Sequence, residues 1–509
     1  MNHISAGGDQ QNVDEQIVSE NYGAEFVEAA VSLARTIDGI EEQGEILSSG
    51  ADIYAQSGQL DLAVNLVQTI DDSYQRDLAL TKIAAICATG GDRDQADSLL
   101  EMIEDDTVYA AGIEQIAAAY ARQGKIDDAV ETARRLSDSD SALSSVARAC
   151  PSRDLLTDCC EIARAIEYPE LKVSALIELA GQAQKLEAPD ESTELIEEAE
   201  SAIPEIEFPE QRIEARSRIA TLYKNNNQIE QAAEVLSKAR TDCEETDQSG
   251  RDTARYQIAA AYAGLREFNT AEQLLEEIED PYEFCHATAA VAFEHYQAGD
   301  QNAALKLLAD GLEIIKDEPV YGERSLISRR VVLGFLAETY ASIGRLDDAL
   351  QVTELQDSEE QQDSTLAQIA FTSASSDDPN TAFKVFEKIK DDSMRVLGKV
   401  NVVRAWTLSD RLEIADHLLS SASAEVAKVE WPQQRTRCLA ELAQAYELRE
   451  QPGRCTETLF EALNTATTIK GSYFQARALI GLAVLHKELA RSTSEAERQV
   501  LEEIIYRLD

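Results

Sequence analysis

The sequence is short of basic charge, and of lysine in particular. Its 509 residues hold 95 Asp and Glu against 46 Lys and Arg, which gives a formal net charge of −49, and only 15 of the 46 are lysines. Nucleic acids and anionic lipid surfaces are bound through a basic footprint. We therefore expect no nucleic acid and no membrane among the partners. A protein or peptide partner, including a basic one, remains compatible with this charge.

The acidic residues are spread along the whole chain in short pieces such as EEIED and DSEE. This spacing is typical of a solvated acidic surface and not of a binding tail. Two explanations stay open. The surface could be an adaptation to molar salt, as in a halophile, where self-repulsion is screened, or it could match a basic partner.

Long apolar runs are missing as well. The first residues, MNHISAGGDQQNVDEQ, contain no basic region followed by an apolar one, and no later run approaches the length of a membrane span. We expect a cytoplasmic protein whose residues 1–20 form a disordered tail.

Residues that usually carry catalysis are scarce. There are five histidines, and the eight cysteines show no paired zinc spacing. HExxH, GxxxxGK(S/T) and GxSxG motifs are absent. The adjacent Cys159 and Cys160 could be redox-active, but successive helical residues point about 100° apart, so packed thiols are the better interpretation. We expect no enzyme, no cofactor and no metal site.

What the chain does contain is a repeat. YAQSGQLDLA at 54–63, YARQGKIDDA at 120–129 and YASIGRLDDA at 340–349 are nearly the same ten residues. Extending this frame defines an aromatic position and, nine residues later, an alanine position. The aromatic position holds Tyr54, Cys87, Tyr120, Cys150, Ala183, Tyr223, Tyr262, His295, Tyr340, Ser373, Trp406, Tyr446 and His486. The alanine position holds Ala30, Ala63, Ala96, Ala129, Cys159, Ser192, Ala232, Ala271, Ala304, Ala349, Ala382, Ala415, Cys455 and Glu495.

The residue type at each position of the repeat has a physical explanation. The aromatic residue ends the apolar stripe of a first helix, and four residues later a glycine position, as at Gly58, Gly91, Gly124, Gly299 and Gly344, suits a left-handed C-terminal cap. Asp or Asn two residues before the alanine position, as at Asp61, is expected to cap a second helix. The alanine marks the closest approach of the two helices. Acidic turns such as IDDS and IEDDT are expected to cap the next first helix. Where the spacing grows by six or seven residues, we expect one extra turn on each of the two helices.

These positions resemble those of the tetratricopeptide repeat (TPR) family. The resemblance implies an all-α fold, an α-solenoid in which about 14 antiparallel helix hairpins stack as a superhelix with a concave groove. We expect the repeat array over 21–318 and 326–494, a loop or joint at 319–325 and a C-terminal capping helix at 495–509.

The resemblance also implies a function. A TPR-like protein is expected to be a scaffold or adaptor that binds a peptide or helix in its groove. Carrying the family's groove positions over by frame gives Tyr256, Phe293, Tyr296, Phe371 and Arg404 as candidate partner-binding residues, with the four rings as apolar anchors. The opposing interpretation is that these rings are core. The alternative function is a regulatory or sensor subunit whose superhelix changes shape on binding a peptide or small ligand. For the oligomeric state we expect a monomer or a weak homodimer.

Overall fold

The computed structural model describes residues 22–318, 322–374 and 379–508. Within these ranges the regular elements are 27 α-helices and three short 3-10 helices, so the all-α prediction is confirmed. The predicted tail at 1–20 and residues 319–321 of the predicted joint lie outside the described residues.

The helices alternate between two roles. The first helices of the hairpins are α2 (Ile40–Gln56), α4 (Ser73–Gly90), α6 (Asp106–Arg122), α8 (Asp140–Arg148), α10 (Pro169–Lys185), α12 (Pro209–Asn225), α14 (Gln248–Gly264), α16 (Pro281–Gln297), α18 (Gly322–Ser342), α20 (Glu359–Ala374), α22 (Asp392–Leu408), α24 (Pro432–Leu448) and α26 (Ser472–Glu488). The second helices are α3 (Leu60–Val67), α5 (Arg93–Leu100), α7 (Ile126–Ala133), α9 (Leu156–Arg164), α11 (Pro189–Ala202), α13 (Ile229–Cys243), α15 (Phe268–Glu276), α17 (Gln301–Asp317), α19 (Leu346–Thr353), α21 (Asn380–Phe386), α23 (Leu412–Glu425) and α25 (Pro452–Ala466). The two terminal helices are α1 (Ala24–Ala34) and α27 (Glu495–Tyr506), and the 3-10 helices are η1 (Arg153–Leu155), η2 (Ile203–Glu205) and η3 (Val426–Lys428).

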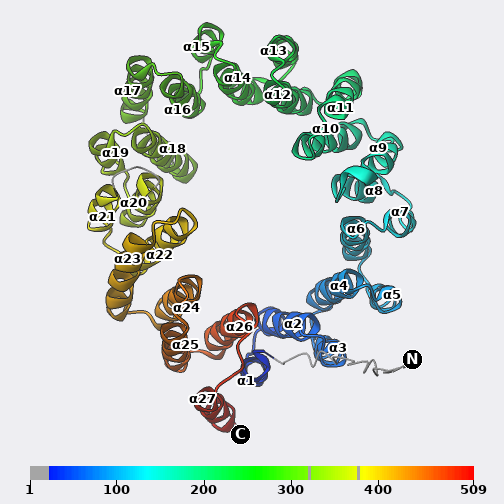
Figure 1. The fold of residues 1–509 in the computed structure, drawn as a ribbon, viewed down its shortest axis with the longest axis vertical. Helices are drawn as coiled ribbons and strands as arrows, with labels where there is room; N and C mark the ends of the chain where they lie inside the picture. The colour runs from blue at the N-terminus through cyan, green and yellow to red at the C-terminus, as the bar shows by residue number, and fades with distance from the viewer. Residues whose placement is uncertain (1–21, 319–321, 375–378, 509) are drawn as a thin grey trace, which may run out of the picture.

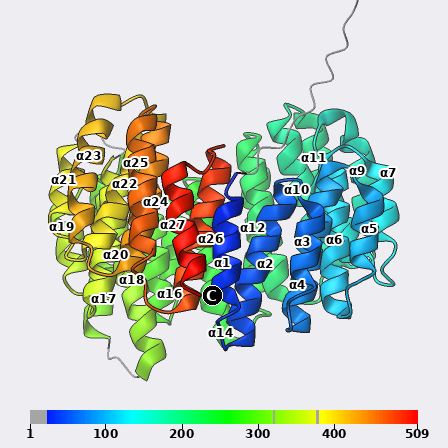
Figure 2. The same cartoon turned by 90° about the horizontal axis from the view of Figure 1, so that it is seen from below.

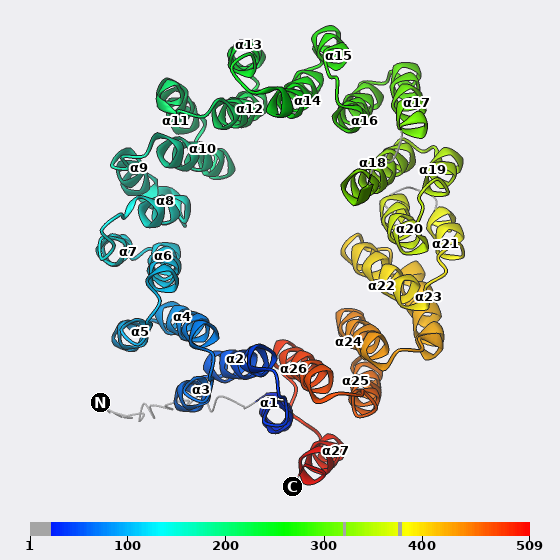
Figure 3. The same cartoon turned by 180° about the vertical axis from the view of Figure 1, so that it is seen from behind.

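The hairpins form a closed ring. Figure 1 shows the first helices on the inside and the second helices on the outside, and the same arrangement is seen from behind in Figure 3. The helices run roughly along the ring axis (Figure 2). Each first helix packs on its own second helix and on the first helices beside it. The predicted α-solenoid is therefore confirmed, but its stack closes on itself instead of continuing as an open superhelix. Closure of 13 hairpins requires an average rotation of about 28° from one to the next.

The turn inside each hairpin follows the predicted geometry. The five glycines at the glycine position have φ between 76° and 91°, in the left-handed region. Six hairpins without glycine there keep the same backbone, because the six non-glycine residues of positive φ in the described chain all occupy this position. They are Glu187, Asn227, Arg266, Asp410, Glu450 and Ala490. Among the described residues, the exception is Asp154 after α8, which lies in the 3-10 helix η1. The repeat therefore imposes the turn even on residues for which this conformation costs roughly 1 kcal/mol.

The first-helix caps agree with the prediction, whereas the second-helix caps do not. Asp72 and Asp105 in the acidic turns accept hydrogen bonds from backbone N–H groups at the starts of α4 and α6. Asp61, however, lies in the first turn of α3, where Gln59 is the N-cap and no side chain caps the helix. The predicted cap position, at Asp61, lies two residues after the observed N-cap, Gln59. An aspartate at this site instead interacts with the positive end of the helix dipole.

The extra residues of the longer repeats also lie elsewhere than expected. The first helices α10, α12 and α24 keep the 17 residues of α6. The second helices grow from eight residues in α3 and α7 to 15 in α13 and α25. An inner helix packs between neighbouring inner helices, and most inner helices keep 17 residues, although α8 has nine and α18 has 21. In the longer repeats named here, it is the outer helix that grows.

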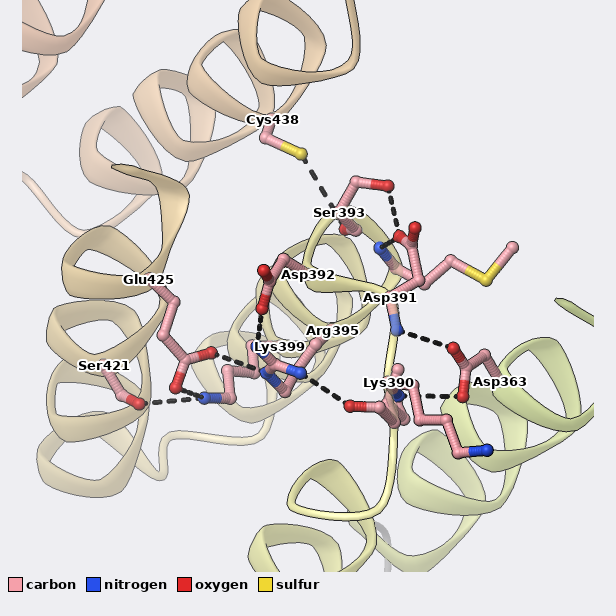
Figure 4. A network of polar contacts seen from close by, with 12 residues as sticks. Asp363, Lys390, Asp391, Asp392, Ser393, Arg395, Lys399, Ser421, Glu425 and Cys438 are labelled. Carbon is pink, nitrogen blue, oxygen red and sulfur yellow. Dashed lines mark hydrogen bonds and ion pairs between the residues drawn. The ribbon is translucent and has the colours of Figure 1, made fainter. Parts of the chain in front are cut away.

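Buried aspartates join neighbouring hairpins, and the sequence did not lead us to expect them. Asp77, Asp140, Asp252 and Asp363 each lie ten residues before an aromatic position and are at most 8% exposed. The Asp77 carboxylate accepts hydrogen bonds from the backbone N–H groups of Glu104 and Asp105, at 3.0 and 2.9 Å, in the turn before the next first helix. Figure 4 shows the equivalent Asp363, with the ion pair of Lys399 and Glu425 nearby. Each turn is thus held by the hairpin before it.

The ring is closed by the first helix of the described chain. α26 has no second helix directly after it on its outer side, and α1 packs there as the second helix of this hairpin, while α27 packs on α1 and α25 (Figure 1). Phe26 of α1 is fully buried, with its ring centroid 4.4 Å from that of His486. Gly23 has φ 81°, and a Cβ at this residue would lie 2.6 Å from the carbonyl oxygen of Ala483. Only glycine allows this approach of the two ends of the chain.

Polar groups also bridge the seam, which we define as the contacts of α1 and α2 with α26 and α27. Beside the seam, Glu497 of α27 is buried and lies 3.2 Å from Nε2 of His486 in α26. Burial alone would raise the pKa of Glu497, but hydrogen bonds from His486 and Ser494 outweigh it and hold this pKa below its usual value. The Thr36 hydroxyl donates to the Ser472 hydroxyl at 2.7 Å. The two ends of the chain are thus joined by packing and by a hydrogen bond, and the buried Glu497 holds α27 on α26.

Candidate partner-binding surface

The surface available to a partner inside the ring follows from the repeat frame. In every first helix, the positions nine, five and two residues before the aromatic position and two residues after it form one stripe. Among the described residues of these four rows only Ala118 is buried. The other faces of the first helices pack on neighbours, so this stripe faces the middle of the ring (Figure 1). We call it the inner face.

The inner face has almost no net charge, although the chain as a whole carries −49. Its four rows hold eight basic and seven acidic residues. The basic residues are Lys82, Arg122, Arg148, Lys185, Arg218, Arg404, Arg437 and Arg477, and the acidic ones are Glu45, Asp52, Glu178, Glu214, Glu338, Glu441 and Glu488. The excess acid therefore lies on the outer helices, the turns and the rims. Repulsion of an acidic partner or attraction of a basic one acts from outside, not from the inner face.

Three of the five predicted site residues lie in one row of the inner face. Phe293 of α16, Phe371 of α20 and Arg404 of α22 each stand two residues before an aromatic position. Phe293 is 37% exposed and Phe371 is 41% exposed. Arg404 is not free, because its guanidinium donates to Gln444 at 2.6 Å and pairs with Glu441 at 2.5 Å.

The other two predicted residues are partly covered by core packing. Tyr256 of α14 and Tyr296 of α16 are half-buried and pack against the hydrophobic core. The Tyr256 ring lies 6.1 Å from the ring of His286, between centroids. Tyr296 follows the aromatic position directly and so belongs to none of the four inner rows. For these two rings the structure favours packing over a free anchor.

Two apolar residues of α18 that are not among the predicted site residues lie on the helix between those of Phe293 and Phe371 in ring order. Ile327 is 52% exposed and Val331 is 53% exposed. Val331 stands nine residues before the aromatic position, and this row could have been read from the sequence. We call these four exposed side chains, Phe293, Ile327, Val331 and Phe371 on α16, α18 and α20, the apolar strip. Ile327 and Val331 lie on earlier turns of α18 than Glu338, which occupies the row of Phe293 and Phe371.

A pocket of about 310 Å³ opens beside the strip, between α18 and α20, with walls that include His286, Val331, Phe335 and Glu338. The rings of His286 and Phe335 lie 5.3 Å apart. Burial lowers the pKa of His286, against the opposing effect of Glu283 and Asp280, and burial raises the pKa of Glu338. Both shifts favour the uncharged forms. The pocket is therefore suited to an apolar side chain with a polar edge.

Metal sites and membrane spans are not found in the described part of the chain. No group of three or more His, Cys, Asp or Glu in it could hold a metal ion, and none of its helices is long and apolar enough to cross a bilayer. His295 and His486 pack at the aromatic position; His295 is stacked on Phe268, and His486 is tilted against Phe26. Seven of the eight cysteines are buried.

Comparison with known proteins finds helical-repeat structures at low similarity. Human IFIT1, solved as a dimer with PPP-AAAA, is 14% identical, covers 87% of this chain and 95% of its own, and gives a TM-score of 0.29. A Rap protein complexed with competence and sporulation factor is 14% identical, with coverage of 78% and 98% and a TM-score of 0.27. A signal transduction ATPase from Pyrococcus horikoshii with a tetratricopeptide repeat sensor is 15% identical, with coverage of 86% and 71% and a TM-score of 0.24. No family model matches the chain, and no curated protein matches it. The chain is a TPR-like α-solenoid on the evidence of its own hairpins.

Proposed function

We propose that the protein is a ring-shaped scaffold that binds a peptide or helix of a partner protein on its inner face, at the apolar strip. The observation that carries this proposal is the partial exposure of Phe293 and Phe371 with Ile327 and Val331 between them in ring order. Large apolar side chains left exposed on the inner surface of a repeat protein are candidates for an interaction site. Rings in such a place act as anchors when a partner desolvates them.

The charge of the inner face supports a partner recognised by apolar anchors. Acidic and basic residues nearly balance on the inner face. A strongly basic segment would therefore gain little electrostatic attraction from the inner face beyond the attraction that the acidic outer surface already exerts. We therefore propose a segment with two or more apolar side chains, spaced to meet α16 and α20, and no required charge.

Closure of the ring bears on the alternative, a sensor whose superhelix changes shape. An open stack changes pitch by small rotations between repeats. A closed ring can do so only by breaking the seam, where Phe26 is buried. A scaffold of nearly fixed shape is therefore the better candidate, and an unchanged radius of gyration on binding is the expected result.

The test is capture of partners from native extract by three forms of the protein. Phe293→Asp with Phe371→Asp should remove binding and leave the fold intact, because both side chains are partly exposed. Phe208→Asp is the matched control, since Phe208 is 56% exposed and lies at the start of α12, outside the inner face. One protein held by wild type and the control, lost by the folded double variant and cross-linked to α18 or α20, is the expected result. Equal capture by all three forms, or collapse of the double variant, would contradict the proposal.

A further inference from the structure

The pocket beside the apolar strip has an unsatisfied hydrogen-bond acceptor in its wall. Gln356, in the segment between α19 and α20, lines this pocket and is 3% exposed. Its backbone N–H donates to the Thr353 carbonyl, its backbone carbonyl accepts from Gln362 at 2.8 Å, and its side-chain NH₂ donates to the Arg330 carbonyl at 3.1 Å. The side-chain oxygen Oε1 is left without a hydrogen-bond partner in the described chain. A buried acceptor in this state favours a ligand that can donate to it.

The amide end of Gln356 reaches the wall of the pocket because Gly334 has no side chain. A Cβ at Gly334 would lie 3.4 Å from Nε2 of Gln356 and 3.3 Å from the hydroxyl oxygen of Thr365. Gly334 and Thr365 line the same pocket. The oxygen without a partner therefore belongs to an amide group at the pocket wall, between α18 and α20.

The rest of the wall is suited to an aromatic ring. Val331 and Phe335 of α18 and the ring of His286 supply flat and apolar surface. Arg330 lines the pocket too, and its Nε–H has no acceptor in the described chain. The face of an aromatic ring can accept from such an N–H, and it attracts a guanidinium most strongly when the ring is that of tryptophan. The volume of about 310 Å³ is close to the lower limit of ligand pockets, which is suited to a single side chain.

We propose that this pocket holds the indole of a tryptophan in the partner segment, with the indole N–H donating to Oε1 of Gln356 and one ring face toward Arg330. The source of the tryptophan, a partner held on the inner face, rests on the proposed function. An indole is a donor only, so it satisfies the acceptor and brings no unpaired acceptor of its own. Phenylalanine would leave Oε1 without a partner. Because Val331 belongs both to the apolar strip and to the pocket, one bound segment can occupy the two together.

The test measures binding to the full-length protein by fluorine NMR, with 5-fluoroindole as the reporter. N-acetyl-tryptophanamide should displace the reporter. N-acetyl-3-benzothienylalaninamide, in which a sulfur replaces the N–H in a ring of nearly the same shape, should bind roughly tenfold more weakly, because it cannot donate. Equal displacement by the two compounds, or no binding of the reporter, would overturn the proposal. Free tryptophan should displace the reporter less well than its capped form, and a better displacement would overturn the assignment to a partner's side chain.

Two variants assign the hydrogen bond. Gln356→Leu removes the acceptor, so the two capped compounds should bind equally, even if both bind more weakly than to the wild type. Gln368→Leu is the matched control, because Gln368 is an exposed amide in the wall of the same pocket. It should keep the roughly tenfold preference for the indole. A preference that survives in Gln356→Leu, or is lost in Gln368→Leu, would contradict the role of Gln356.

The double variant Phe293→Asp, Phe371→Asp separates this pocket from the proposed function. Neither residue is among those that line the pocket, so the variant should lose the protein partner and still bind 5-fluoroindole. If the wild type binds the reporter and captures no partner, the proposed function is wrong and the pocket remains. If it captures a partner and does not bind the reporter, the pocket assignment is wrong and the proposed function remains.

Discussion

Replacing Phe26 with alanine should loosen the seam while the rest of the ring stays folded. Phe26 is fully buried between α1 and α26 and packs on His486. Removing a buried phenylalanine ring costs about 3–5 kcal/mol, from lost transfer energy and the cavity left behind. Since 1.4 kcal/mol is a factor of ten, the population with α1 detached should rise roughly 100- to 4,000-fold.

This loss can be compared with the total free energy that burial of the α1 side chains contributes at the seam. The larger apolar side chains of α1 are Phe26, Val27, Val31 and Leu33, all at most 9% exposed. Burial of each contributes about 1.5–3 kcal/mol, so together they supply about 6–12 kcal/mol as an upper limit. Phe26→Ala thus removes close to half of this stabilisation of the seam. The variant should remain mostly closed, with detachment visible as a minor population.

Hydrogen exchange measures that population directly. Protection of the α1 amides should fall by the same 100- to 4,000-fold in Phe26→Ala, whereas α10 and α12 on the far side of the ring should be unchanged. Phe386→Ala is the matched control, because Phe386 is 1% exposed but lies in α21, away from the seam. It should lower protection around α20 to α22 only. Unchanged α1 exchange in Phe26→Ala, or unprotected α1 amides in the wild type, would refute the reasoning.

Three further predictions concern the seam, the contact of α27 with α26, and the acidic surface. Gly23→Ala should destabilise the protein, because its Cβ would meet the Ala483 carbonyl. Gly481→Ala, in α26 with open space at its Cβ, should stabilise the protein by up to about 1 kcal/mol. The same change of melting temperature in both variants would contradict this prediction. Because the folded-state pKa of Glu497 is depressed from its usual 4.5, its contribution is present at neutral pH and lost as the pH falls below about 4.5. Urea titrations should show that Glu497→Gln lowers the free energy of unfolding by about 1–3 kcal/mol at pH 7, and that this free energy falls less steeply with acidification than in the wild type. An equal loss of stability in Glu495→Gln, at an exposed residue, would refute the prediction. The melting temperature should rise between about 0.05 and 2 M KCl, as the Debye length shrinks toward about 3 Å or less, and a flat profile would exclude a salt-adapted surface.

Local features of the fold could be predicted because each depends on a few neighbouring residues. The left-handed turn at Gly124 and the acidic cap at Asp105 follow from local backbone chemistry that recurs in many of the hairpins. The second-helix cap was placed wrongly at Asp61, since a two-residue shift leaves the helical pattern unchanged.

Closure of the ring could not be predicted from the repeat. It depends on the rotation between neighbouring hairpins, which small differences in packing set, summed over the whole circle. One trace of it was present in the sequence. Ala30 occupies an alanine position with no first helix before it in the frame, and this unpaired second helix is the one that completes α26.

The candidate surface was predicted in part, for a related reason. The frame located Phe293 and Phe371 on the inner face because their row has a fixed offset from the aromatic position. The burial of Tyr256 depends on His286 in the next hairpin, and the position of Cys150 outside regular helix depends on the shortened α8. Contacts between elements of irregular length are not encoded in the repeat.

The most direct test of the closed ring is a cross-link between its two ends. Thr36 and Ser472 touch through their hydroxyls at 2.7 Å, so the double variant Thr36→Cys, Ser472→Cys places two thiols in bonding range. Mild oxidation followed by peptide mass spectrometry should show a disulfide between positions 36 and 472 in protein that remains a monomer by light scattering. If the thiols stay free, or if the link joins two different chains, the ring does not close on itself.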